Sequence, residues 1–428
     1  MRRSVVLVSL DWIRPQDPRT GLGVASIASA LRHAGVHLQV VGDAVNRPGF
    51  DEDAFTNRVI GLIEELGDDV VVGIAAFVWN EPEVVRLLGR VRAYSSATIV
   101  LGGPQVSYVG PGGLEALYPE VDLFVRGHGE AAMVAIALSG PQRGLGIHVA
   151  GTADVGERSD LDLGDLPSPH LDGTLPIGPH VRWETQRGCP FACKFCQHRE
   201  PGSRLRNRNL AEKRVLAEAA AFAKGGVVRA SVLDPIFHTD RTRAVRLLRQ
   251  FKEIGLRAEL SLQCRFELVD DALLDALGGL NVALEFGLQT IHQEEGRAIG
   301  RPNNMERVEG VIRQLHSRDL DFEVSLIYGL PNQTLESFSR SVDWCLARNV
   351  PRVRAWPLML LRGTPLHTDR ARWGFAESIG ERIPIVVSSP TFTADEHAQM
   401  AQIAEALLGP TMPTRPVAGG RRNAVSSS

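Results

Sequence analysis

Apolar, strand-like runs alternate with helical stretches along most of the chain, and this alternation restricts the fold more than any other feature of the sequence. In residues 1–150 five runs predict strands: Ser4–Leu10, Val36–Val41, Val70–Phe77, Thr98–Leu101 and Val121–Val125. Three segments between them carry apolar residues at helical spacing: Val24–His33, Phe55–Leu66 and Glu83–Tyr94. Strands that alternate with helices predict an α/β fold with a doubly wound parallel sheet. In such a sheet, ligands bind beyond the carboxyl ends of the strands.

The alternation restarts at Val181. Five further runs predict strands: Val227–Leu233, Ala258–Gln263, Val282–Phe286, Phe322–Ile327 and Val353–Leu360. The helical stretches that separate them are Leu210–Ala223, Thr242–Ile254, Asp271–Leu277, Met305–Ser317 and Leu335–Arg348. Repeated strand–helix units of one polarity predict a full or partial barrel, with its site at the carboxyl ends of the strands.

Residues 141–180 are rich in Gly, Pro and Asp and have little periodicity, which predicts a linker packed across a domain junction. We therefore expect a first domain, a linker, a partial barrel, a C-terminal helical segment and a disordered tail, at 1–150, 151–180, 181–370, 371–410 and 411–428. Within the helical segment, Thr393–Glu396 has the pattern of a capping box that starts a helix reaching Leu408. The tail has the composition of a disordered terminus.

Charge and hydropathy argue against two classes of partner. The formal net charge is −3 over 428 residues, so no basic field attracts nucleic acid or an anionic membrane. The apolar run at the start breaks at Asp11, and no small-residue cleavage site follows, so it does not resemble a signal peptide. No uninterrupted apolar stretch reaches the roughly 18 residues that a membrane helix requires. We expect a cytoplasmic protein that binds neither nucleic acid nor membrane.

Three of the five cysteines lie within eight residues of one another: Cys189, Cys193 and Cys196. A cluster of three is a poor disulfide framework and a good set of metal ligands. Thiolates normally ligate a [4Fe–4S] cluster in fours, so three from one loop would leave the fourth iron open to a small molecule. The alternatives are a structural zinc site with His198 as fourth ligand, or free thiols. Cys264 and Cys345 adjoin apolar runs and are expected in the core.

The spacing of these cysteines, with Phe195 just before the last one, resembles the signature of the radical S-adenosylmethionine (SAM) superfamily. The resemblance implies that SAM chelates the open iron through its amino and carboxyl groups. It also implies that one electron from the cluster splits SAM into methionine and a 5′-deoxyadenosyl radical, which abstracts hydrogen from the substrate. An external electron donor, such as flavodoxin, ferredoxin or a dedicated reductase, would then be required.

Two segments that follow predicted barrel strands also resemble this superfamily, and the resemblance covers about 181–370. They are Glu285–Thr290 and Tyr328–Thr334, and in the second Asn332 stands where the family has a glycine. The resemblance implies SAM contacts from residues near strand ends and beside the cysteines: Phe195, Asp234, Gln263, Arg265 and Gln289.

Residues 1–150 resemble the Rossmann-like cobalamin-binding domain that precedes many radical SAM enzymes, through Gly73–Asn80, Leu101–Tyr108 and Val125–Glu130. The resemblance implies that cobalamin is approached closely by the backbone of Gly102, Gly103 and Pro104. Two departures are present: no D-x-H-x-x-G segment supplies a histidine to cobalt, and Ala75 replaces a common serine. The alternative is a domain that serves as a lid or substrate wall without cobalamin.

Two reactions fit these features. The first is cobalamin-dependent C-methylation of a small natural product, in which the cofactors carry the chemistry and the protein positions them. The second is cobalamin-independent radical dehydration or deoxygenation, similar to the diol dehydratases of aminoglycoside biosynthesis. Candidate residues for proton transfer are the polar side chains Tyr328, Glu285 and His238. A third hypothesis, an electron carrier without turnover, would not need a barrel.

Overall fold

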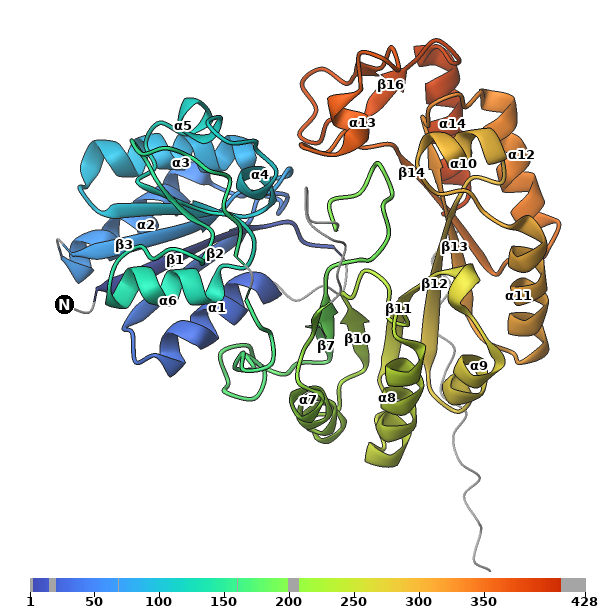
Figure 1. The fold of residues 1–428 in the computed structure, drawn as a ribbon, viewed down its shortest axis with the longest axis horizontal. Coiled ribbons are helices and arrows are strands. Elements are labelled where there is room, and N and C mark those ends of the chain that lie inside the picture. Colours follow the sequence, from blue (N-terminus) through green and yellow to red (C-terminus); the bar gives the residue numbers. More distant parts are fainter. Residues whose placement is uncertain (1–2, 15–20, 68, 160, 199–207, 409–428) are drawn as a thin grey trace, which may run out of the picture.

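The computed structural model describes residues 3–14, 21–67, 69–159, 161–198 and 208–408. Figure 1 shows an N-terminal domain beside an open barrel, with a C-terminal segment above the barrel that leans toward the N-terminal domain. The tail predicted to be disordered, 411–428, lies outside the described residues.

The N-terminal domain is built on a six-stranded sheet with the order β2-β1-β3-β4-β5-β6. Its five parallel strands are β1 (Ser4–Asp11), β2 (Leu38–Ala44), β3 (Val70–Ala75), β4 (Thr98–Gly102) and β5 (Leu123–Val125). One face is covered by α1 (Leu22–His33) and α6 (Glu130–Leu138), and the other by α2 (Glu52–Leu66) and α3 (Glu81–Tyr94). The predicted doubly wound sheet is confirmed. Its strand order reverses between β1 and β3, so their carboxyl ends form the crevice where such folds bind ligands.

One strand of this sheet was not predicted. The three residues of β6 (Ile147–Val149) pair antiparallel with β5, and a run this short carries no periodic signal. Just beyond it, the Arg126 guanidinium donates to both oxygens of Asp154 at 2.8 and 2.7 Å, and both side chains are buried. The start of the predicted linker is therefore fastened to the N-terminal domain.

The rest of the linker packs between the two domains. Arg32 on α1 donates to Thr174 at 2.8 Å, while His170 Nε2 lies 3.0 Å from Arg182 O at the first barrel strand. Leu163 joins the hydrophobic core of the barrel. The segment thus contacts both domains.

The second sheet has the order β7-β10-β11-β12-β13-β14, and all neighbouring strands are parallel. The strands are β7 (His180–Trp183), β10 (Arg229–Val232), β11 (Glu259–Cys264), β12 (Val282–Gln289), β13 (Phe322–Tyr328) and β14 (Arg352–Pro357). The helices that cover them are α7 (Glu212–Lys224), α8 (Arg241–Ile254), α9 (Asp271–Leu277), α11 (Met305–Ser317) and α12 (Leu335–Leu346). Because β7 and β14 are the two edges of this sheet, the predicted partial barrel is confirmed.

Side chains on each barrel strand alternate between the helix layer and the lumen. On β12, Leu284 and Phe286 belong to the large hydrophobic core beneath the helices, whereas Glu285 and Gly287 are only partly buried and face inward. This alternation decides which of the predicted site residues can reach a ligand in the barrel.

The described residues after β14, 358–408, are called the C-terminal segment from here on. They contain α13 (Pro365–Thr368), a hairpin of β15 (Ala376–Glu377) and β16 (Val386–Ser388), and α14 (Ala394–Ala406). The predicted capping box is confirmed, since Thr393 and Glu396 exchange hydrogen bonds between side chain and backbone. The hairpin was not predicted, because its strands have only two and three residues. Within the described ranges, no helix combines the length and the apolar character that crossing a membrane requires.

Candidate active site at the domain interface

The three clustered cysteines lie in one loop, residues 188–198, which we call the cysteine loop. It follows β8 (Gln186–Arg187) at the carboxyl end of the first barrel strand. Cys193 is buried, and the thiols of all three are free. Lys194 N–H donates to Ile299 O at 2.9 Å, which holds the loop against the segment after β12.

Two arginines point their guanidinium groups at the buried cysteine. Nη1 of Arg265 lies 4.0 Å from the Cys193 sulfur, and Nη1 of Arg301 lies 3.7 Å from it. Arg265 also stacks on the Phe191 ring at 3.8 Å and pairs with Glu267 at 2.9 Å. Arg265 is one of the residues predicted from the sequence. Arg301 was not predicted, because its one sequence signal is its place in a Gly-Arg-Pro turn.

The donor set fits a [4Fe–4S] cluster. Burial raises the pKa of the Cys189 thiol and raises that of Cys196 to about 11, so burial favours the neutral thiols over the thiolates. Binding of metal displaces such protons, and the two guanidinium groups beside Cys193 offset the negative charge of the thiolates. Among the described residues, no three or more His, Cys, Asp or Glu side chains are grouped to hold a metal ion. Cluster thiolates each bind a different iron, so they need not converge on one point.

Asp234 and His238 follow β10 and are both fully buried. The Asp234 carboxylate accepts hydrogen bonds from Thr185 N at 2.7 Å, from Thr185 Oγ1 at 2.5 Å and from Gln186 N at 3.2 Å, while burial raises its pKa to about 6. Burial lowers the pKa of His238 to about 4, and its Nε2 donates to Arg265 O at 3.1 Å. Asp234 therefore fixes the segment that leads into the cysteine loop, and His238 fixes the backbone at Arg265. The implied SAM contact of Asp234 and the proton transfer by His238 stay predictions.

Glu285 and Gln263 are brought together in the barrel lumen. They are register partners on β12 and β11, and the Gln263 amide donates to the Glu285 carboxylate. The Ser261 hydroxyl donates to the other carboxylate oxygen. The structure thus joins Gln263 and Glu285 in one hydrogen-bonded cluster. The implied SAM contact of Gln263 and the proton transfer by Glu285 stay predictions.

Tyr328 does not face the lumen, so the structure does not support a catalytic role for it. Its ring is 7% exposed and lies 5.1 Å from the ring of His397 and 5.7 Å from that of Phe338, between β13 and the outer helices. The alternation along β13 turns its neighbour Ile327 inward instead. Phe195 is likewise partly buried against this hydrophobic core.

Backbone strain marks two predicted segments. Gln289 has φ +69° where β12 shifts register between Gly287 and Gln289. A non-glycine residue in the left-handed region is uncommon and is found most often at turns and functional sites. The implied cofactor contact of Gln289 stays a prediction. Asn332 has φ +63°, and because asparagine tolerates this region, the turn survives without the family's glycine.

The Gly-Gly-Pro segment of the N-terminal domain is not an open loop. Gly103 has φ +92°, and a Cβ there would lie 2.6 Å from Ala76 O, the backbone of the loop after β3. Pro104 starts the short helix α4 (Pro104–Ser107), and Gly102 ends β4. Glycine at 103 is thus required by a contact within the chain. The implied approach of Gly102, Gly103 and Pro104 to cobalamin stays a prediction.

Trp79, beyond the carboxyl end of β3, carries an unsatisfied donor. Its ring stacks on Phe77 with centroids 4.4 Å apart, and its buried Nε1 has no hydrogen-bond partner in the part of the chain that is described. Buried donors are normally paired, so this one fits a bound group rich in acceptors, such as the amide-bearing corrin. Residues 11–23, after β1, include no histidine to ligate cobalt.

Two comparisons by family model agree with this geometry. Residues 183–345 match the model of the radical SAM superfamily, and residues 18–137 match that of the B12 binding domain. The two matches coincide with the barrel and with the N-terminal domain.

The chain is also similar to curated proteins. Cobalamin-dependent radical SAM methyltransferase TokK of Streptomyces tokunonensis is 25% identical over 355 residues, which cover 74% of this chain and 51% of TokK. The 2-(S-pantetheinyl)-carbapenam-3-carboxylate methyltransferase of Streptantibioticus cattleyicolor is 25% identical over 363 residues, 76% of this chain and 52% of that protein. The chain thus spans about half the length of these two relatives.

Among solved structures, the radical SAM methyltransferase TsrM from Kitasatospora setae, with cobalamin and a [4Fe–4S] cluster bound, aligns with a TM-score of 0.73. The alignment covers 100% of this chain and 94% of TsrM at 17% identity. At this identity the likeness establishes a shared fold.

Proposed function

We propose a methyl-transfer function from one premise: the chain belongs to the radical SAM superfamily and carries a B12-binding domain ahead of its radical SAM domain. As an enzyme of this kind it uses a [4Fe–4S] cluster, SAM and cobalamin. Its reaction, on this proposal, is cobalamin-dependent C-methylation of a small natural product. The names of the relatives TokK and the carbapenam methyltransferase support the reaction type.

One observation carries the proposal. The carboxyl edge of the N-terminal sheet borders the cysteine loop at the carboxyl edge of the barrel. At that sheet edge lies the Trp79 indole donor, which has no partner among the described residues. The Tyr108 hydroxyl donates across this border to Gln197 O, directly after Cys196. Groups held at the two edges would therefore face a common substrate.

The chain's own residues bind the cofactors and orient them toward the substrate. When bound, the cluster, SAM and cobalamin supply the radical that activates the substrate and the methyl group that replaces its hydrogen. Cys189, Cys193 and Cys196 would hold the cluster, and Arg265 and Arg301 stabilise its negative charge. In the lumen, the hydrogen-bonded pair of Gln263 and Glu285 presents polar groups that can orient SAM or substrate hydroxyls.

A second candidate, cobalamin-independent radical dehydration, is favoured by one observation. Ala75, at the end of β3, has no side-chain hydroxyl to bind a nucleotide tail at the ligand edge of the sheet. In this reaction the N-terminal domain would act as a wall of the substrate site. Glu285 would then be the half-buried lumen group best placed to move a proton.

The test uses protein reconstituted anaerobically with iron and sulfide, with and without hydroxocobalamin. After desalting, the absorption of retained corrin is recorded, and dithionite and SAM are added. Methyl transfer uses SAM both as the methyl donor and as the source of the radical, so mass spectrometry should find S-adenosylhomocysteine and 5′-deoxyadenosine. S-adenosylhomocysteine should form only when corrin is present. Formation of 5′-deoxyadenosine alone, without retained corrin, would instead support dehydration.

A further inference from the structure

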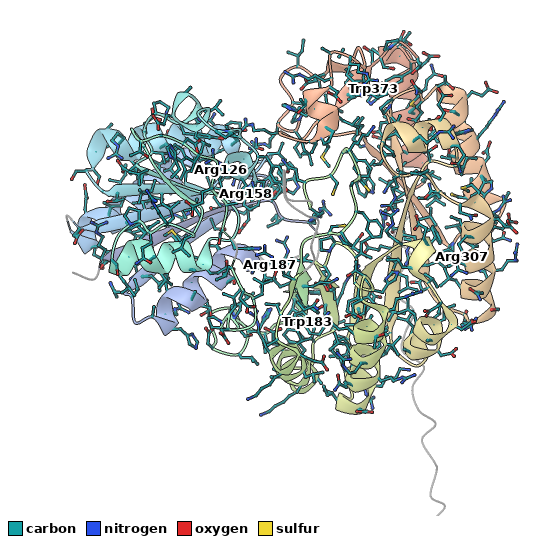
Figure 2. All side chains as sticks on the ribbon, in the orientation of Figure 1. Arg126, Arg158, Trp183, Arg187, Arg307 and Trp373 are labelled. Atoms are coloured by element: carbon teal, nitrogen blue, oxygen red, sulfur yellow. The ribbon has the colours of Figure 1, made fainter. Side chains whose placement is uncertain are left out.

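A buried ion pair joins the N-terminal domain to the entry of the cysteine loop. Arg187 lies two residues before Cys189, and its Nη2 is 2.8 Å from an oxygen of Glu130 on α6. The same nitrogen lies 2.6 Å from Glu184 of the barrel, while Ser26 of α1 donates to Glu130 at 2.8 Å. Figure 2 shows Arg187 between the N-terminal domain and the first barrel strand.

This ion pair is well shielded from water. The Arg187 side chain is 17% exposed and that of Glu130 is 4% exposed. Burial alone raises the pKa of Glu130, but Arg187 outweighs it and lowers the value to about 2, so the carboxylate stays ionised. Separating such a pair leaves a buried charge without compensation, and the pair therefore resists relative movement of the two domains.

A second contact holds the exit of the loop. The Tyr108 hydroxyl donates to Gln197 O, one residue after Cys196. The Gln197 amide in turn donates to Arg362 O at 2.8 Å, and the Arg362 guanidinium pairs with Glu81 of the N-terminal domain at 2.9 Å. The exit of the loop is thus enclosed by the N-terminal domain and the C-terminal segment.

We infer that Glu130, Arg187 and Tyr108 are positioning residues for the [4Fe–4S] cluster, so that the N-terminal domain forms part of the iron–sulfur site. The barrel holds the middle of the loop through Lys194, and its Glu184 shares Arg187 at the entry of the loop. The N-terminal domain holds both ends, and it thereby fixes the first and last cysteine relative to its own ligand edge. The inference depends on the cysteine loop binding the cluster and not on cobalamin or on methyl transfer.

The test compares reconstituted wild-type protein with Glu130→Gln, Tyr108→Phe and a control, Asp154→Asn. The control removes the charge of another buried arginine–carboxylate pair of the N-terminal domain, with side chains 2% and 4% exposed. The partners of that pair at Val109, Gly112 and Gly156 lie outside the cysteine loop. Three quantities are measured: iron release to bathophenanthroline, the electron paramagnetic resonance (EPR) spectrum of the reduced cluster with SAM, and the Tm.

Glu130→Gln loses a charge-assisted hydrogen bond, so iron release should be about tenfold faster than in wild type. Tyr108→Phe loses a neutral hydrogen bond, so its iron release should be about fivefold faster. Both should change the EPR spectrum, whereas Asp154→Asn should lower the Tm and leave release and spectrum as in wild type. Wild-type release and spectra in the two variants would overturn the inference. Tyr108→Phe removes the hydroxyl and keeps the aromatic ring, so this variant tests the inference even if Glu130→Gln does not fold. Corrin retention, measured separately, tests only the proposed function.

Discussion

Replacing Gly103 by alanine should destabilise the N-terminal domain before any cofactor binds. Gly103 has φ +92°, and a Cβ at this position would lie 2.6 Å from Ala76 O and 3.0 Å from Ala76 N. Both contacts are with the backbone of the neighbouring loop, so rotation of a side chain cannot relieve them. Either the loop after β3 or the start of α4 would have to move.

The magnitude follows from two costs. A left-handed backbone costs an L-residue about 1–2 kcal/mol, and forced overpacking costs about 1–3 kcal/mol, so Gly103→Ala should cost about 2–5 kcal/mol. Gly49 is a matched control, because its φ is +75° but no atom lies within 4 Å of its Cβ. Gly49→Ala should therefore cost only the backbone part, about 1–2 kcal/mol.

Thermal unfolding of the cofactor-free variants is the assay. In a domain of this size 1 kcal/mol corresponds to about 2–4 °C, so Gly103→Ala should lower the Tm of the N-terminal domain by about 4–20 °C and Gly49→Ala by about 2–8 °C. Equal shifts in the two variants would refute the argument that the contact with Ala76 requires glycine. If Gly103→Ala weakened corrin binding and left the Tm unchanged, glycine at 103 would instead be required for the approach of cobalamin.

The remaining predictions concern three residues of the barrel. Tyr328→Phe should leave 5′-deoxyadenosine formation unchanged, because its ring lies in the core; a large loss at unchanged Tm would contradict this. Asp234→Asn should cost about 1–3 kcal/mol of stability, seen as a lower Tm, since its carboxylate binds Thr185; loss of SAM affinity alone would contradict this. Arg301→Gln should lower the midpoint potential of the cluster by about 60 mV in a potentiometric EPR titration, and an unchanged potential would show that Arg301 does not act on Cys193.

Most of the fold could be predicted because the buried faces of its strands leave apolar runs in the sequence. Val70–Ala75, the central strand β3, is almost entirely buried and therefore appears in the sequence as an unbroken apolar run. The missed elements are too short for any period to show: β6 has three residues and the strands of the C-terminal hairpin have two and three. Their formation depends on neighbours distant in the sequence.

The site could be predicted only where its residues are neighbours in the chain. The cysteine spacing identified the loop, but the approach of Arg301 to Cys193 joins residues 108 positions apart. Tyr328 was predicted as a site residue because it is a polar residue directly after a predicted strand. A shift of one position along a strand turns a side chain from the lumen to the core, and Tyr328 lies on the core side. The pairing of Arg187 with Glu130 depends on how the two domains pack against each other. The hydrophobic periodicity within each domain carries no information about that packing.

The most direct test of the central claim is electron–nuclear double resonance on the reduced, reconstituted protein with SAM labelled by ¹⁵N at its amino group. With a cluster held by three cysteines, the protein should contain about four irons per chain and show coupling between the labelled nitrogen and the cluster. Combined replacement of Cys189, Cys193 and Cys196 by alanine should abolish both. Zinc in place of iron and sulfide, or a cluster without coupling to SAM, would contradict the account.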